Sequence, residues 1–274
     1  MLFNQIRSSL KRGYNNLRFH LSARNNPLFI GYYKYLYKPE PGSLEEFIDL
    51  YSRDKSGSFT VVQIGANDGI NHDPIHKFIK RDNWQGLLVE PQPQVFKRLE
   101  AVYSRNPGIK AVNAAIAPEN GIGTIYRIAF SNARWANGLT SFNKETLVNS
   151  FNNGMIDRKA QKEGLKVPER WEDRIAEDKV RLVTAYTLLK EGGIDSIDLL
   201  QIDTEGYDYE ILKMFEIEKT KPQAIIFETI HFSLETLAAS LDLLTRNNYK
   251  VKTYGANSLA LGPALVNKYR HFTN

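Results

Sequence analysis

The sequence contains no cysteine among its 274 residues. This absence excludes disulfide bonds, zinc sites with cysteine ligands, and catalysis by a thiol. The sequence also has no run of about 18 apolar residues, which a transmembrane helix requires. No apolar stretch near the N-terminus leads to a small-residue cleavage site, as a secretory signal would. We therefore expect a cytoplasmic protein.

Apolar residues are sufficient for a folded core. Hydrophobic residues make up 42% of the chain and aromatic residues 11%, which is typical of a globular protein of this length. We expect a basic and aromatic arm over residues 1–42 and one domain over residues 43–274. The Pro39–Gly42 stretch predicts the joint between them.

Positive charge gathers in this arm, although the formal net charge of the whole chain is only +5. Charge runs most often form solvated surfaces, so a solvated extension is one interpretation. The other is peripheral contact with the inner face of a membrane or with a phosphorylated carrier. Tyrosines alternate with Lys34 and Lys38, but we expect no nucleic acid partner. The cations of the arm are Arg7, Lys11, Arg12, Arg18, Arg24, Lys34 and Lys38.

Strand and helix patterns alternate along the rest of the chain. This alternation predicts an α/β fold with a doubly wound, mostly parallel, Rossmann-like sheet. A last pair of strands after the final helix would give the sheet an antiparallel edge. The predicted strands cover residues 59–64, 86–90, 110–117, 198–202, 224–228, 249–254 and 258–261.

The stretch from about 131 to 180 breaks this rhythm. It is rich in Asn, Lys and Glu, contains Trp135 and Trp171, and has no clear core strand. We interpret it as an inserted cap segment over the carboxyl edge of the sheet, where open α/β sheets bind ligands. A mobile surface loop is the alternative.

Two features predict a nucleoside cofactor. The first predicted strand runs into Gly65-Ala66-Asn67-Asp68-Gly69, a loop whose backbone can turn sharply and approach a ligand. The second strand ends at Glu90-Pro91, and an acidic side chain there can accept both hydroxyls of a ribose. The third glycine of a dinucleotide site is missing. The pattern therefore favours S-adenosylmethionine over NAD.

Carboxylates follow two further strands. The apolar run 199–202 leads into Asp203 and Glu205, and Ile225-Ile226-Phe227 leads into Glu228, with His231 shortly after. The interiors of parallel strands exclude such groups unless they are paired. We expect these four side chains to gather around one crevice, although any one of them alone could serve as a helix cap.

These motifs resemble the FkbM-type methyltransferase family. The resemblance rests on residues 63–69, Val89-Glu90-Pro91, residues 198–206 with Tyr209-Glu210-Ile211-Leu212, and Phe227-Glu228 with His231. It covers about residues 59–262 and leaves the arm unexplained. Thr204 stands where the family often has valine. The resemblance implies a class I methyltransferase fold and O-methylation, commonly of sugars in glycans or of hydroxyl-bearing natural products.

On this basis we predict roles for the site residues. The loop glycines and Asn67 would hold the amino-acid end of the cofactor, Glu90 its ribose, and Asn113 or Ala114 its adenine. His231 is the predicted base, because a neutral histidine can take a proton near pH 7. The predicted cofactor residues are Gly65, Ala66, Asn67, Asp68, Gly69, Glu90, Pro91, Asn113, Ala114 and Asp203; the predicted catalytic residues are His231, Glu228, Asp203 and Glu205.

Alternatives remain at this point. Asp203, Glu205 and Glu228 could instead bind Mg²⁺ and acidify a sugar diol or a lipid or natural-product acceptor. A non-catalytic module that binds adenosine or a glycan carrier is the rival from another class. We place His72 and His76 on a helix surface, outside the site. The identity of the acceptor and the oligomeric state stay open.

Overall fold

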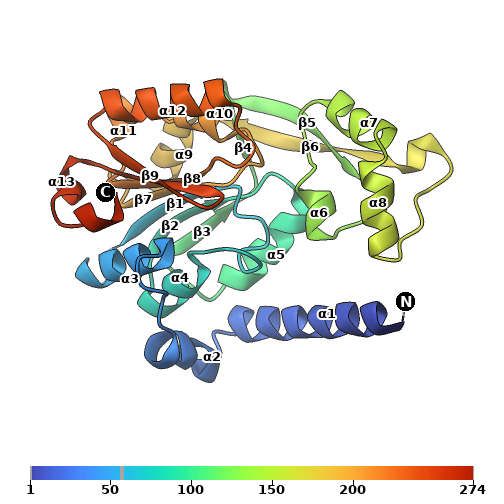
Figure 1. The fold of residues 1–274 in the computed structure, drawn as a ribbon, viewed down its shortest axis with the longest axis horizontal. Helices are drawn as coiled ribbons and strands as arrows, with labels where there is room; N and C mark the ends of the chain where they lie inside the picture. The colour runs from blue at the N-terminus through green and yellow to red at the C-terminus, as the bar shows by residue number, and fades with distance from the viewer. Residues whose placement is uncertain (1, 56–58, 274) are drawn as a thin grey trace.

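The computed structural model describes residues 2–55 and 59–273 and contains a central sheet of seven strands in the order β3-β2-β1-β7-β8-β10-β9 (Figure 1). The first five of these strands are parallel, and β10 pairs antiparallel with both β8 and β9. The predicted doubly wound sheet with its antiparallel edge is confirmed. The strands are β3 Ile109–Val112, β2 Gln85–Val89, β1 Thr60–Ile64, β7 Leu199–Ile202, β8 Ala224–Glu228, β10 Asn257–Leu261 and β9 Lys250–Tyr254.

Helices cover both faces of this sheet. Alternate strand residues point to opposite faces, so Val61 and Leu88 belong to one buried cluster and Val62 and Leu87 to the other. The first face packs against α3 Leu44–Asp54, α4 His76–Asp82, α5 Pro93–Tyr103, α13 Pro263–Val266 and η3 Arg270–Phe272. The second packs against α9 Ala185–Gly192, α10 Asp208–Met214, α11 Ile217–Thr220 and α12 Leu234–Arg246.

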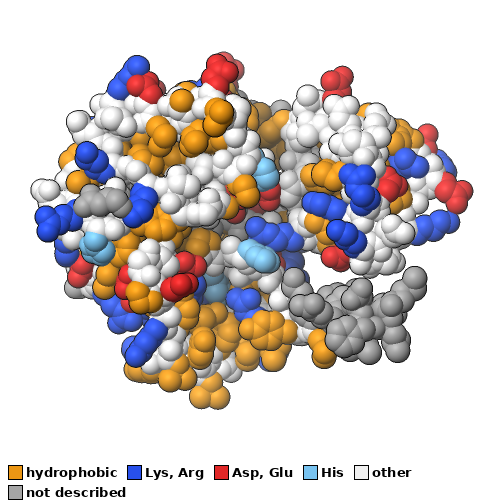
Figure 2. Space-filling view, viewed as in Figure 1, with side chains coloured by type: hydrophobic (Ala, Val, Ile, Leu, Met, Phe, Trp, Pro, Cys, Tyr) orange, Lys and Arg blue, Asp and Glu red, His pale blue; other side chains and the backbone are white. Residues whose placement is uncertain are grey.

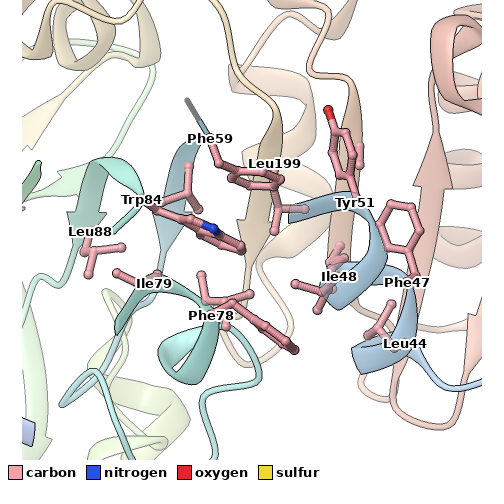
Figure 3. Close-up of a cluster of buried hydrophobic side chains, with 14 of the residues drawn as sticks. Leu44, Phe47, Ile48, Tyr51, Phe59, Phe78, Ile79, Trp84, Leu88 and Leu199 are labelled. Carbon is pink, nitrogen blue, oxygen red and sulfur yellow. The ribbon is translucent and has the colours of Figure 1, made fainter. Parts of the chain in front are cut away.

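Aromatic rings fill the first of these clusters (Figure 3). The rings of Phe59 and Trp84 stack with centroids 4.0 Å apart, and Phe78 lies parallel on the Trp84 ring. Burying one such ring contributes about 2–3 kcal/mol relative to leaving it exposed. The Trp84 indole donates to Ser52 of α3 at 2.7 Å, so this packing also fixes α3 on the sheet.

Most predicted strands shift by one residue at an end. Helix α4 begins at His76. The predicted strand 110–117 is two strands, β3 and the short β4 Ala115–Ile116, which belong to different sheets. The chain turns away between them, where the Asn113 amide donates to the carbonyls of Glu90 and Pro91.

A second, three-stranded sheet lies beside the first, in the order β4-β6-β5. It consists of β4 with β5 Gly121–Ile128 and β6 Ile175–Val183. The stretch 131–180, predicted to hold no clear core strand, contains the start of β6, which belongs to this second sheet. Between the strands lie α6 Arg134–Asn137, α7 Lys144–Asn152, α8 Met155–Lys162 and η2 Trp171–Asp173. Ile128, Leu147 and Ile156 give this part a small core of its own.

The N-terminal arm packs under α4 and α5 (Figure 1). It comprises α1 Leu2–Ala23, α2 Pro27–Gly31 and the π-helix η1 Tyr32–Leu36. Ser22 is fully buried against His76, whose ring nitrogens lie 3.2 Å from the Ser22 hydroxyl and 3.1 Å from the Tyr103 hydroxyl. The arm is therefore not a wholly solvated extension. The surface position predicted for His76 is wrong, whereas His72 is exposed in the turn before α4.

Candidate functional site

The predicted site residues stand in one row across the sheet. The last paired residues of β3, β2, β1, β7 and β8 are in register, from Val112 to Phe227. The residue that follows each of them is therefore at the same carboxyl edge. The strand order changes direction between β1 and β7, which is where open α/β sheets bind ligands. The row consists of Asn113, Glu90, Gly65, Asp203 and Glu228.

Gly65 allows two strand ends to touch. Its φ is +78°, and a Cβ atom there would lie 1.9 Å from the carbonyl oxygen of Asp203. Any other side chain would push β1 and β7 apart. Asn67 and Gly69 also have positive φ values, of 49° and 71°. The loop after β1 is thus a tight turn against the end of β7.

Glu90 joins this loop to the next one. Its carboxylate accepts the backbone N–H groups of Asn67 at 3.0 Å and of Gln92 at 2.9 Å. Burial, with a smaller contribution from the charge of Asp203, raises the pKa of Glu90 to about 7. Each carboxylate oxygen keeps a second lone pair for a further donor.

Five predicted cofactor residues are buried or held by structural contacts. The Asp68 carboxylate accepts the backbone N–H groups of Ile70 and Asn71, and so closes its own loop. Ala66 and Ala114 are both buried. Asn113 and Pro91 are held together by the Asn113 amide, as described above. These residues shape the edge of the sheet from within.

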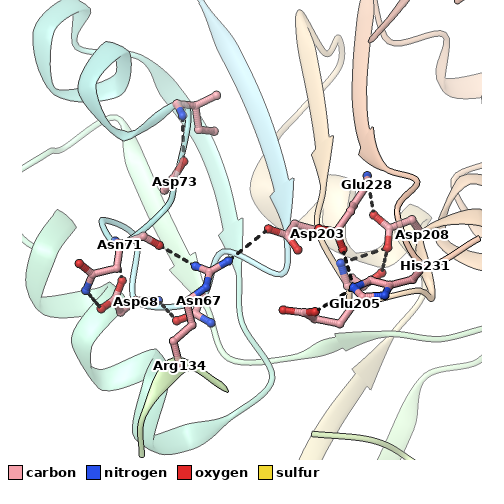
Figure 4. Close-up of polar contacts among 12 residues, drawn as sticks. Asn67, Asp68, Asn71, Asp73, Arg134, Asp203, Glu205, Asp208, Glu228 and His231 are labelled. Carbon is pink, nitrogen blue, oxygen red and sulfur yellow. Dashed lines mark hydrogen bonds and ion pairs between the residues drawn. The ribbon is translucent and has the colours of Figure 1, made fainter. Parts of the chain in front are cut away.

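A second group of side chains lies beside the row (Figure 4). The Nε2 atom of His231 is 3.3 Å from Glu205 Oε2 and 3.5 Å from Glu228 Oε2. The three side chains approach one another because Glu205 follows β7, Glu228 is the last residue of the neighbouring β8, and His231 follows β8. His231 is about half exposed, whereas Glu228 is largely buried. The structure thus brings three of the four predicted side chains together, and Asp203 lies outside this group.

Negative charge exceeds positive charge here. Burial, followed by repulsion from Glu205, raises the pKa of Asp203 to about 6. Burial, followed by repulsion from Asp203, raises the pKa of Glu228 to about 7. The Oε2 atom of Glu228 is buried and has no hydrogen-bond partner. The opposing cation is Arg134, whose Nη2 atom is 4.0 Å from Asp203.

Two residues of this site were missed by the sequence analysis. Asp208 is fully buried and accepts the Thr204 hydroxyl at 2.8 Å and the backbone N–H of Glu228 at 3.0 Å. It therefore ties the end of β7 to the end of β8. In the sequence it is indistinguishable from an ordinary acidic residue in a first helical turn.

Glu205, for which helix capping was an alternative, makes no cap contact with α10.

Arg134 is the second missed residue, and it belongs to the predicted cap segment. Its Nη1 atom donates to the carbonyl of Asn71 at 2.7 Å. Nearby, the Gln92 side chain donates to the Asn137 carbonyl at 3.1 Å. Part of the segment therefore borders the loops after β1 and β2. A lone arginine in a polar segment gives no signal that would have singled it out.

The side chains that could together hold a metal ion are not the three carboxylates predicted for Mg²⁺. In the parts of the chain that the structure describes, Glu205, Glu228 and His231 offer ligand atoms within 4.8 Å of one another. Asp203 is not in this group. The alternative of Mg²⁺ held by Asp203, Glu205 and Glu228 therefore gains no support, and Mg²⁺ prefers oxygen ligands to a histidine nitrogen.

Comparison with known proteins identifies the family. Residues 63–251, more than half of the chain, match the methyltransferase FkbM domain. The chain belongs to the FkbM methyltransferase family. The matched region contains the glycine loop, Glu90, Asp203 and the Glu205, Glu228 and His231 group, so the family resemblance predicted from these motifs is confirmed.

Solved structures with a similar chain trace include other methyltransferases. A methyltransferase FkbM from Methylobacillus flagellatus KT has 14% identity and a TM-score of 0.46, with 90% of this chain and 59% of that chain covered. The METTL16 MTase domain has 14% identity and a TM-score of 0.42, with 82% and 70% covered. The chain thus spans about three fifths of the length of the Methylobacillus protein. No curated protein matches the sequence.

Proposed function

We propose that this FkbM-family chain transfers the methyl group of S-adenosylmethionine to a hydroxyl of a sugar, a glycan or a similar small hydroxylated acceptor. The observation that supports this proposal most directly is the His231 imidazole between the carboxylates of Glu205 and Glu228. An imidazole so placed is suited to remove a proton from a hydroxyl. A module that only binds a nucleoside needs no such group.

The charges at this edge favour the cofactor. The glycine loop brings backbone close to the end of β7, and we assign the ribose to Glu90 and the adenine to the edge beside Asn113. Asp203, Glu228 and Glu90 all have raised pKa values because they are buried near one another. A cationic sulfonium with an ammonium group relieves that repulsion. An anionic dinucleotide would increase it.

The chemistry divides between the cofactor and the chain. When bound, S-adenosylmethionine would supply an electrophilic methyl group and leave as S-adenosylhomocysteine. The His231 imidazole would take the proton of the acceptor hydroxyl. Glu205 and Glu228 then stabilise the imidazolium. Glu228, with a pKa of about 7, is the second candidate for that proton.

The experiment that tests this function combines binding with turnover. Calorimetry should give micromolar affinity for S-adenosylhomocysteine, about −8 kcal/mol, and Glu90→Ala should weaken it by about 1–3 kcal/mol. Labelled S-adenosylmethionine should transfer its methyl group to members of a panel of oligosaccharides. Tight binding of NADH without S-adenosylhomocysteine would overturn the cofactor assignment. Cofactor binding with transfer only to lipid or natural-product hydroxyls would overturn the acceptor class.

A further inference from the structure

Residues 1–39, nearly the whole N-terminal arm, carry charge of one sign only. All 31 acidic residues of the chain follow residue 39, whereas the arm contributes lysines and arginines along its whole length. Such asymmetry between a short segment and the body of a protein indicates an anionic partner for that segment. Nothing in the proposed methyl transfer accounts for it, because none of its predicted cofactor or catalytic residues belongs to the arm.

One side of the arm is occupied by contacts with the domain. Tyr33 is buried edge-to-face against His76, and the Arg98 guanidinium lies 4.4 Å over the Phe19 ring. The Asn25 amide donates to the Arg105 carbonyl at 2.8 Å. These contacts fix which side of α2 and η1 points outward.

The outward side is apolar and cationic. Leu28 is 86% exposed, Tyr35 73% and Leu36 70%. Lys34 and Lys38 are exposed among them. Figure 2 shows apolar and cationic side chains together along the lower edge of the molecule, where α2 lies in Figure 1. We call Leu28, Tyr32, Lys34, Tyr35, Leu36 and Lys38 the arm patch.

We propose that the arm patch docks on the surface of an anionic phospholipid bilayer. Leucine side chains at such a tip enter the acyl boundary, tyrosines lie at the headgroup level, and lysines contact the lipid phosphates. Exposed leucines offer nothing to a nucleic acid backbone, which is why lipid is favoured over that anionic partner. No helix in the described residues is long and apolar enough to cross a membrane.

Sedimentation of the full chain with vesicles tests this proposal. Binding to phosphatidylcholine vesicles containing about a third phosphatidylserine should exceed binding to pure phosphatidylcholine and weaken with added salt. Lys34→Glu with Lys38→Glu should lower the partition coefficient at least about twentyfold, because each lost cation is worth about fivefold. Leu28→Ser should lower it about tenfold through the lost apolar contact.

Matched variants on the opposite side of the molecule serve as controls. Leu234, 87% exposed on α12, is as accessible as Leu28, so Leu234→Ser should leave vesicle binding unchanged. Lys219→Glu on α11 is the control for the charge reversals. Affinity for S-adenosylhomocysteine should be equal in all variants, which shows that they fold. Equal losses in patch and control variants would overturn the proposal. If the chain does not bind vesicles, binding to a DNA duplex would instead show a nucleic acid partner. In that case a dimer that is lost in Leu28→Ser would show that the patch is an interface between two copies of the chain.

Discussion

Lys80 and Glu228 are both ionisable groups that are shielded from water, but the two regions around them offer different hydrogen-bond partners. Lys80 lies under the arm and is 1% exposed. Its ammonium donates to four oxygens, the carbonyls of Ser22 and Val102 and the side chains of Asn25 and Asn106, at 2.6–3.1 Å. Glu228 lies at the carboxyl edge of the sheet, where its buried Oε2 atom has no hydrogen-bond partner.

The difference separates structural groups from reactive ones. Burial lowers the pKa of Lys80 to about 7, and its hydrogen bonds hold two segments together, here the arm and α4. A buried carboxylate near other carboxylates is stabilised when it binds a cation or a proton. The comparison predicts that substitutions under the arm reduce stability, whereas substitutions at the sheet edge reduce activity.

The largest expected effect is on turnover. His231→Ala should lower the rate of methyl transfer about 10²–10⁴-fold and leave the affinity for S-adenosylhomocysteine nearly unchanged, because the proton acceptor is lost and the cofactor loop is not touched. Steady-state kinetics with calorimetry measures both. If Glu228→Gln has the larger effect, Glu228 is the base. Glu235→Gln, at an exposed position of α12, is the matched control.

The metal alternative gives a different result in the same assay. EDTA should leave the rate of the native protein unchanged. Loss of activity with EDTA and recovery with Mn²⁺ would show that Glu205, Glu228 and His231 hold a divalent cation, and would contradict the base mechanism.

The next effect is on stability. Lys80→Met keeps the volume of the side chain but leaves four oxygens without their donor, so the free energy of unfolding should fall by about 2–4 kcal/mol. Urea denaturation measures this change. Lys97→Met, at an exposed position of α5, should change stability by less than about 0.5 kcal/mol. Equal stability of the two variants would mean that the polar cluster does not hold the arm.

The smallest expected effect is a gain in the free energy of unfolding, where Lys80→Met causes a loss. The pKa of Asp203 is raised to about 6 from an ordinary value of 3.8, so the folded chain binds this proton more tightly than the unfolded chain does. The free energy of unfolding should therefore fall as the pH rises through that window. Asp203→Asn should remove this slope and stabilise the ligand-free protein by about 1–2 kcal/mol at pH 8.

Denaturation of Asp203→Asn at pH 4 and pH 8 checks this expectation. Asp195→Asn, at an exposed loop position, serves as the control. Destabilisation by Asp203→Asn at pH 8 would contradict the contrast between the two regions, because the carboxylate would then behave like Lys80.

Sequence patterns predicted the edge of the sheet because that edge is locally encoded. An apolar run of this kind forms a buried strand of a parallel sheet. Such a run directly precedes each of Gly65, Glu90, Asp203 and Glu228. Once the strands align, the residues after them meet. Their spacing in the sequence is irrelevant, so no long-range contact had to be guessed.

Other features depended on contacts that no local pattern encodes. The burial of His76 requires the arm to dock on α4, through Ser22, which lies 54 positions away in the sequence. The break after β3 follows from the hydrogen bonds of Asn113, although the apolar run continues. Strand β6 has three charged residues in a row at 177–179 and pairs mainly with β5, so its sequence is equally typical of a surface segment.

Gly65 has a consequence for the sequences that this site tolerates. Its missing Cβ atom would overlap the backbone of Asp203, and backbone atoms cannot rotate aside as side chains do. In a saturation library at this position every replacement, alanine included, should be depleted, while replacements at the buried Ala66 beside it should be graded by size. The requirement for glycine at position 65 comes from the backbone and is the same for every acceptor. Proteins of this fold that differ in acceptor should therefore differ at residues around this contact and not at Gly65.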